Sequence, residues 1–520
     1  MADSRGRTAD SGSNRSPAVR WLLSAVWPAV IAIAVVLLYR KVLRLWWTWD
    51  DAYLLHIAIV RAAREHFFAP SLWQGMPQRL FTPLLTASYD SELSLFGFDA
   101  RRFYAVYVGE FALLAVLLYA TLRQWLDRCA SASGALLFAL GAPLCLVVTE
   151  LMLMHYVEAL ILCCVATILY QRNRPIASAI VYLAAMLAKE VAVPLIVVLW
   201  LIRRRDTIAH GVGLLIYLIW RTVMLGTLLG GYGYAITLRE VPLLLIKTPW
   251  RIAGAWAGAK PLVGALLVVL VLACAARLWR WTLIALALTI LPIMPVAKAF
   301  DARLAFVPWL AIAFVFAFAA KQNRALLVIA PLLAIVVNRQ TWTVDYSKAI
   351  RQSNEARVYF DLGDNDLLAH PLIPPAAIAE LTWLKREWLH RGGNSGWYYD
   401  DLFVCEGKAA GKRVFAWRGR SVVQTDAQCP PSRVVPMTIE FHHRGDSLFW
   451  RFGPYRDGTW SVLIADGIQA FDVPPEDGYR LGGVPAIGLR VKYTSPQGWS
   501  SYSPEFPLDF AKQPDVRYRR

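Results

Sequence analysis

The chain has 520 residues, of which 57% are hydrophobic and 18% are charged, and its mean hydropathy is +0.43. A soluble chain could not keep so much apolar surface dispersed, so the composition excludes a soluble globular protein and places most of the chain in lipid. The formal net charge of +17 does not indicate nucleic-acid binding, because the basic residues stand between apolar runs and do not line one helix face.

The first segments of the chain predict a cytoplasmic tail followed by membrane spans. Residues 1–20 are rich in serine, glycine and arginine, which predicts disorder. The apolar segment 21–39 resembles a signal peptide, but basic residues follow it and no A-x-A cleavage site does, so we interpret it as a retained span. A span needs about 20 mostly apolar residues. The candidate spans are 21–39, 103–122, 133–149, 151–170, 176–188, 191–202, 208–229, 262–276, 281–296, 304–320 and 325–338.

Charge in the connections predicts the orientation of these spans. If the N-terminus is cytoplasmic, the connections after even-numbered spans face the cytoplasm, and these connections carry eleven basic residues against only Asp127 and Asp206. This asymmetry follows the positive-inside rule. We therefore predict an α-helical polytopic protein of the inner membrane, with 11–13 transmembrane helices in residues 21–338. The eleven basic residues are Arg123, Arg128, Arg172, Arg174, Arg203, Arg204, Arg205, Arg277, Arg280, Lys321 and Arg324.

The same parity places an outer loop at 48–102, a second one at 230–261, and residues 339–520 outside the membrane. After Asn338 the runs RVFAW, TIEFHH, SLFWRF, TWSVLIA and IGLRVKY alternate with period two, so the region from about 400 is predicted as a periplasmic β-sandwich or barrel. Cys405 and Cys429 lie in this region, and a disulfide between them is left open. Three tryptophans either stack on sugars or fill the sandwich core, and the core is the more common role. They are Trp450, Trp460 and Trp499.

The stretch LWWTWDDAYLLH places Asp50 and Asp51 side by side directly after the first span. One interpretation is a solvated loop start within an interfacial belt of aromatic residues, which accounts for the tryptophans but not for two adjacent carboxylates. The other is function, because neighbouring acids raise each other's pKa and suit a general base or a cation site. If a divalent metal binds, Asp50 and Asp51 are its predicted ligands; no other cofactor is indicated.

Further ionisable residues lie at the outer ends of later spans, where they are costly unless they face a cavity or a partner. Lys189 and Glu190 in MLAKEVAVPL are either an ion pair at a helix hairpin or a phosphate-binding group. Asp301 and Arg303 in AFDARLAFVPWL repeat the pattern. His155 and Glu158 are three residues apart and share one helix face. They either line the same cavity or form a pair that satisfies its own hydrogen bonds.

Four stretches resemble, in order, the GT-C glycosyltransferases that use lipid-linked sugars, most closely the protein O-mannosyltransferase and transmembrane mannosyltransferase branch and its bacterial relatives. They are WDDAYLLH, RLFTPLLTASYDSELSLFGFDARRFY, LAAMLAKEVAVPLI and DARLAFVPWLA. The resemblance covers residues 21–340. Phe-Thr-Pro stands where the family often has Arg-Pro, with Arg79 close by, and Ala302 replaces a glutamate. The β-rich region has no counterpart in the family.

The resemblance implies an enzyme that moves a sugar from a polyprenyl phosphate to an outer-face acceptor, which is a glycan, a lipid or a protein. It implies inversion at the anomeric carbon, Asp50 as the base with Asp51 as helper, and Lys189 and Arg303 beside the departing phosphate. Glu190, Asp301, Arg79, His155 and Glu158 complete the expected substrate site. Two other classes stay open: a glycan-joining ligase or polymerase of the O-antigen type, and a non-enzymatic transporter or scaffold. The sugar, the acceptor and the oligomeric state are not indicated by the residues.

Overall fold

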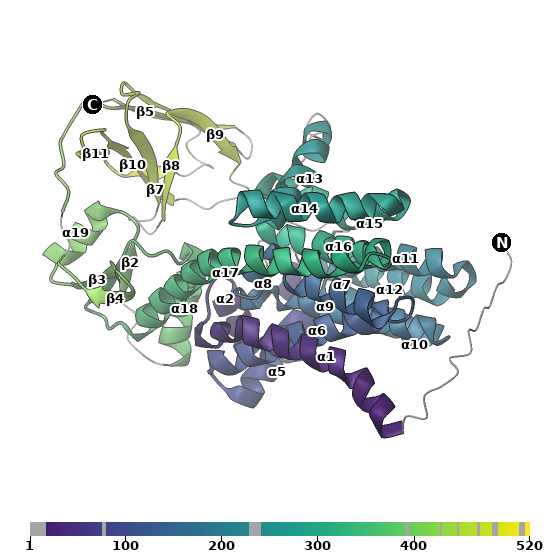
Figure 1. Cartoon of the computed structure of the whole chain (residues 1–520). Helices are drawn as coiled ribbons and strands as arrows, with labels where there is room; N and C mark the ends of the chain where they lie inside the picture. Colours follow the sequence, from purple (N-terminus) through teal and green to yellow (C-terminus); the bar gives the residue numbers. More distant parts are fainter. Residues whose placement is uncertain are drawn as a thin grey trace. The chain divides into compact units, whose positions relative to one another are not determined.

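The computed structural model describes residues 17–74, 80–227, 241–389, 395–426, 429–444, 447–464, 469–480, 487–508 and 515–519 (Figure 1). The chain forms two compact units. Unit 1 is Met1–Arg44 with Ala58–Ser347, and unit 2 is Leu45–Ile57 with Lys348–Arg520. The helices α2 (Asp51–Val60) and α17 (Arg324–Asp361) contribute residues to both units.

Unit 1 is helical, and the chain is a multi-pass membrane protein by the length and composition of its helices. In the described part of the chain, seven helical stretches are long and apolar enough to cross a membrane. The expected 11–13 spans exceed this number, because several apolar runs form shorter helices. The seven stretches are Ala25–Arg44, Ala100–Leu122, Leu151–Gln171, Ile208–Leu225, Pro261–Met294, Ala302–Ala320 and Arg324–Asp361.

The run at 133–149 shows why a span is interrupted. Helix α7 ends at Ala139, and α8 begins at Ala142 with Pro143 in its first turn, which lacks the N–H that a continuous helix would need. Between them only glycine fits at position 141, because the Trp309 indole nitrogen lies 1.9 Å from where a Cβ on Gly141 would be. The helices on either side of Lys189 are also short.

The helices of unit 1 have the following bounds: α1 (Pro17–Tyr39), α3 (Glu65–Phe68), α4 (Pro70–Gln74), α5 (Pro83–Phe96), α6 (Ala100–Leu122), α7 (Arg128–Ala139), α8 (Ala142–Val147), α9 (Met154–Gln171), α10 (Pro175–Ala188), α11 (Leu195–Ile202), α12 (Ile208–Leu225), α13 (Val241–Ala257), α14 (Pro261–Ala275), α15 (Trp279–Ile290) and α16 (Phe306–Ala320). Short 3-10 turns lie between them: η1 (Arg40–Arg44), η2 (Leu151–Leu153), η3 (Glu190–Ala192), η4 (Arg204–Thr207), η5 (Ala276–Leu278), η6 (Leu291–Ala299) and η7 (Ala302–Ala305).

The two expected outer loops contain helices that the sequence analysis did not predict. Helices α2 to α5 lie within 48–102, and α13 lies within 230–261. In α5 the polar residues Ser88, Asp90 and Glu92 interrupt the apolar pattern, so the segment does not resemble an amphipathic surface helix. The Ser88 hydroxyl instead donates to the Glu158 carboxylate, and Glu92 is itself buried.

Buried hydrogen bonds join distant helices of unit 1. Asn338 of α17 donates to the Tyr39 hydroxyl over 3.0 Å, and that hydroxyl donates to the Ala139 carbonyl over 2.8 Å. Ser133 of α7 donates to the Leu327 carbonyl over 2.7 Å. In an apolar surrounding such bonds fix which helices pair, because each polar group lacks water as an alternative partner.

Unit 2 begins with a small α/β part. Its sheet has the order β2-β1-β3-β4, in which β1 runs parallel to both β2 and β3, and β4 is antiparallel. Cys405 and Cys429 form a disulfide with their Cα atoms 5.9 Å apart, so the pairing left open by the sequence is present. The elements are β1 (Asp366–Ala369), α18 (Pro375–Trp383), the π-helix η8 (Leu384–Trp388), β2 (Gly396–Tyr398), α19 (Asp401–Ala409), β3 (Arg413–Arg418) and β4 (Ser421–Gln424).

The rest of unit 2 is a β-sandwich, which confirms the predicted β-rich C-terminal region. Two antiparallel sheets, β11-β10-β7-β8 with β12 on β10, and β13-β5-β6-β9, share one apolar core. Trp450 and Trp460 belong to this core and Trp499 packs against it, which favours the core role over sugar stacking. The strands are β5 (Thr438–Arg444), β6 (Ser447–Gly453), β7 (Thr459–Ile464), β8 (Gln469–Val473), β9 (Glu476–Arg480), β10 (Ile487–Thr494), β11 (Ser500–Tyr502), β12 (Phe506–Leu508) and β13 (Asp515–Arg519).

A buried lysine stabilises the C-terminal end of α17. The Lys385 ammonium donates to the carbonyls of Tyr359 and Leu362 and, over 2.8 Å, to the Ser395 hydroxyl. We expect Lys385→Met to lower the free energy of unfolding of unit 2 by about 1–3 kcal/mol, because it leaves buried carbonyls without their donor. Urea unfolding of the full chain in detergent, followed by trypsin cleavage within unit 2, measures this change. The partly exposed Lys408→Met is the control, and an equal loss in both variants would contradict the capping role.

Candidate active site

Asp50 and Asp51 have different environments. Asp51 begins α2 and is 1% exposed, and its carboxylate accepts the Thr48 backbone N–H over 2.8 Å. The Asp51 N–H donates in turn to the Thr48 carbonyl over 3.0 Å. The two bonds close the four-residue turn from Thr48 to Asp51, which leads directly into α2. Asp51 therefore has a structural role at the start of α2, whereas Asp50 is exposed.

The tryptophans around the aspartates fix the backbone before α2. Trp47 is fully buried, so it does not belong to an interfacial belt. Trp49 has a φ of 50°, which a bulky residue adopts only where its surroundings impose it. The Lys348 ammonium lies 5.7 Å from the Trp49 ring centre, and the Trp46 N–H donates to the Ser353 hydroxyl. These contacts hold the turn in which one aspartate points inward and the other lies at the surface.

Lys189 and Glu190 form a direct ion pair. The chain is extended at Lys189, which separates α10 from η3, and the two side chains meet with Nζ and Oε1 3.2 Å apart. Adjacent residues would not face each other on a continuous helix, so the break makes this pair possible. Lys189 is 4% exposed, and its ammonium also lies 5.3 Å from the Tyr156 ring centre.

A second cation approaches the same part of α9. Arg303 follows Asp301, whose carboxylate accepts the Arg303 backbone N–H over 2.9 Å at the start of η7. The charges of Lys189 and Arg303 both act on the His155 imidazole, which is buried and bonded through Nδ1 to the Met152 carbonyl over 2.7 Å. Both predicted cations therefore lie within electrostatic range of His155 in unit 1.

Arg221 of α12 lies within the predicted span 208–229, and the structure adds it to these cations. Arg221 is 7% exposed, its guanidinium donates to the Tyr217 hydroxyl over 3.3 Å, and its charge acts on Glu190. An arginine in the middle of a predicted span is itself the signal, since such residues usually face a partner or a cavity. The cationic group is defined as Lys189, Arg221 and Arg303.

Glu158 faces a different set of residues from His155, although they lie three apart. It accepts a hydrogen bond from Ser88 of α5, and its charge acts on Glu92 and Glu110. Glu92 is 6% exposed. Burial raises its pKa to about 8, and the neighbouring Glu158 adds to the effect, so this carboxyl is mostly neutral at pH 7. His155 and Glu158 therefore have different hydrogen-bond partners in the structure.

Of the remaining predicted site residues, Arg79 lies outside the described residues. Asp50 and Asp51 belong to unit 2, and the cationic group belongs to unit 1. Within the described ranges, no three His, Cys, Asp or Glu side chains are grouped as metal ligands.

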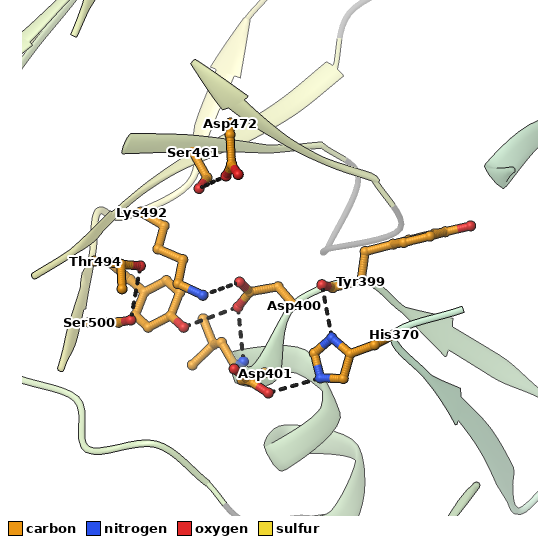
Figure 2. Close-up of polar contacts among 11 residues, drawn as sticks. His370, Tyr399, Asp400, Asp401, Ser461, Asp472, Lys492, Thr494 and Ser500 are labelled. Carbon is orange, nitrogen blue, oxygen red and sulfur yellow. Dashed lines mark hydrogen bonds and ion pairs between the residues drawn. The ribbon is translucent and has the colours of Figure 1, made fainter. Parts of the chain in front are cut away.

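A polar cluster in unit 2 joins the α/β part to the sandwich (Figure 2). Asp400 is 3% exposed and caps α19 through the Leu402 N–H. Its carboxylate also accepts from Lys492 over 2.6 Å and from the Tyr502 hydroxyl over 3.1 Å. One carboxylate therefore holds a helix start to two strands, β10 and β11, and we interpret this cluster as structural.

The neighbouring His370 has both ring nitrogens engaged, by Asp401 at 2.9 Å and by the Tyr399 carbonyl at 3.2 Å (Figure 2). The hydrogen bond to Asp401 raises the pKa of His370, and the same bond lowers the pKa of Asp401. The histidine contributes stability that is full below its unfolded pKa of 6.5 and is lost as pH rises through the folded value. The aspartate contributes stability that is full above its unfolded pKa of 3.8 and is lost as pH falls through the folded value.

We therefore expect the contact to be strongest between these two pH values. Hydrogen exchange of the full chain should show protection of the first turn of α19 that decreases from pH 6 to pH 9. The His370→Asn variant should show a flat profile over the same range after correction for intrinsic exchange. An unchanged slope in the variant would contradict the assignment.

The helices and the C-terminal strands define a multi-pass membrane protein with a β-rich C-terminal region. Neither a family model nor a curated protein matches the chain.

Proposed function

We propose that this chain is a membrane glycosyltransferase that moves a sugar from a polyprenyl-phosphate donor to an acceptor at the outer face. The observation that carries the proposal is the cationic group of Lys189, Arg221 and Arg303 in the membrane unit, in which Lys189 and Arg221 are buried and Arg303 is partly exposed. Charged residues among membrane helices are costly and are usually retained for a partner. A lipid phosphate is an anion that reaches this depth because its polyprenyl chain lies in the bilayer.

The chemistry of the transfer matches these residues. The acceptor hydroxyl oxygen forms a bond to the anomeric carbon, while the bond from that carbon to the phosphate oxygen breaks. The electron pair leaves with the polyprenyl phosphate, which needs positive charge and no proton. Cationic groups aimed at the departing phosphate stabilise the transition state in such reactions. The hydroxyl proton goes to a carboxylate base, a role that the family resemblance assigns to Asp50.

The geometry favours Asp50 over Asp51 for that role. A base must reach the acceptor, and Asp50 is exposed, whereas Asp51 is buried and engaged at the start of α2. The disulfide between Cys405 and Cys429 supports a periplasmic position for the C-terminal region, because disulfides form and persist in oxidising compartments.

The test is a transfer assay with the purified full chain in lipid nanodiscs. Polyprenyl-phosphate sugars labelled in the sugar are offered with glycan, lipid and peptide acceptors, and the labelled product is separated from donor. Transfer by the wild type and its loss in Asp50→Asn support the proposal. Transfer that persists in Asp50→Asn favours a ligase of the O-antigen type. Uptake of the labelled sugar into sealed vesicles without transfer favours a transporter.

A further inference from the structure

His56, the last residue of LWWTWDDAYLLH, is held by two side chains of α18. Its Nδ1 lies 2.8 Å from the Glu380 carboxylate, and its ring stacks on the Trp383 ring with centres 3.5 Å apart and planes 15° apart. The side chains of His56 and Glu380 are 26% and 27% exposed, so a solute can reach them. All three residues belong to unit 2.

The carboxylate determines which nitrogen is left for a ligand. A carboxylate accepts a hydrogen bond, so in the neutral imidazole the proton lies on Nδ1 and Nε2 carries a lone pair. The parallel stack on Trp383 fixes the plane of the ring as well as its position. A simple surface ion pair would need only the contact between His56 and Glu380. The additional stack on Trp383 also fixes the direction in which Nε2 of His56 points.

The local backbone supports a functional origin for this arrangement. Trp383 ends α18, and the next five residues, Leu384–Trp388, form a π-helix. Short π-helical segments are rare, and they occur frequently at functional sites because they change the register of the side chains that follow. Here the change directs Lys385 inward, where it is 1% exposed, while Trp383 stays partly exposed beside His56.

The position of His56 on α2 relates it to the proposed reaction centre. Asp51 and His56 are five residues apart, which is ~7.5 Å along a helix and about 140° around it. This rotation agrees with a buried Asp51 and a partly exposed His56. A molecule that lies along the exposed side of α2 therefore passes from the Asp50 end to His56 within the length of a short oligosaccharide.

We propose that His56, Glu380 and Trp383 form a carbohydrate-binding subsite that holds the acceptor glycan. The identification of the bound glycan as the acceptor rests on the proposed function. Flat aromatic rings pack against the apolar faces of sugar rings, and the imidazole and carboxylate bond the hydroxyls at the ring edge. A peptide or lipid acceptor has no such dense array of hydroxyls, so the chemistry indicates a glycan.

A footprinting experiment tests the subsite without requiring activity. Diethyl pyrocarbonate modifies the unprotonated imidazole of His56 in the full chain, and peptide mass spectrometry measures the rate. Oligosaccharides of glucose, galactose, mannose and N-acetylglucosamine are the probes, and His442 is the internal reference. Protection of His56 but not of His442 by at least one oligosaccharide is the expected result. Equal rates with and without every oligosaccharide, or protection by a peptide probe alone, would overturn the proposal.

Two variants separate binding from folding. Trp383→Ala removes the stacking ring and should weaken oligosaccharide protection about tenfold, equivalent to ~1.4 kcal/mol. Trp417→Ala, on β3, is the matched control and should leave protection unchanged. Where transfer is measurable, Trp383→Ala should raise the KM for a glycan acceptor with kcat unchanged, whereas a defect in kcat alone would contradict a binding role. Protection without any transfer would leave the subsite standing and remove the proposed function.

Discussion

Sugar transfer by the Asp50→Asn variant is expected to be about 10²–10⁴-fold slower than by the wild type, because the amide cannot accept the acceptor's proton. The loss should appear in kcat, since the amide keeps the size and most hydrogen bonds of the carboxylate. Initial rates at saturating donor and acceptor measure it. The folding of the variant should be unchanged, because Asp50 is exposed and lies before the first turn of α2.

The matched variant Asp51→Asn should behave in the opposite way. It weakens the bond to the Thr48 N–H, so we expect the free energy of unfolding to fall by about 0.5–2 kcal/mol, with transfer close to the wild-type rate. Thermal unfolding in nanodiscs measures the first effect and the transfer assay the second. If Asp51→Asn abolishes turnover while Asp50→Asn does not, the roles of the two carboxylates must be exchanged.

Lys189→Met is expected to have the largest effect in unit 1. Removal of Lys189 leaves the partly exposed Glu190 carboxylate without its direct ion pair, although the charge of Arg221 still acts on it, so we expect a cost of about 1–3 kcal/mol. Loss of one cation beside the departing phosphate should in addition lower transfer about 10²–10³-fold. Donor titration of the transfer rate, together with thermal unfolding, measures both effects.

The double variant Lys189→Met with Glu190→Gln separates the two effects. It removes both charges, so stability should recover relative to Lys189→Met, while transfer should stay low. Lys189→Arg keeps the charge and should keep most of the activity. Full recovery of transfer in the double variant would mean that Lys189 only neutralises Glu190 at the helix break.

The sequence by itself determined the features that depend on neighbours along the chain. Apolar runs gave helices in each of the eleven predicted segments, and period-two runs gave strands at RVFAW, TIEFHH, SLFWRF, TWSVLIA and IGLRVKY. Local periodicity is sufficient there because side-chain direction follows directly from backbone geometry.

The tertiary structure decided which polar residues meet. The break at Lys189, the inward turn of Asp51 and the charge effects of Arg221 on Glu190 and of Arg303 on His155 depend on packing between segments that are far apart in the sequence. The parallel pairing of β1 with β2 and β3 also joins distant segments. A buried charge is stable only beside a partner, and the partner is chosen by the whole fold, so local pattern cannot assign it.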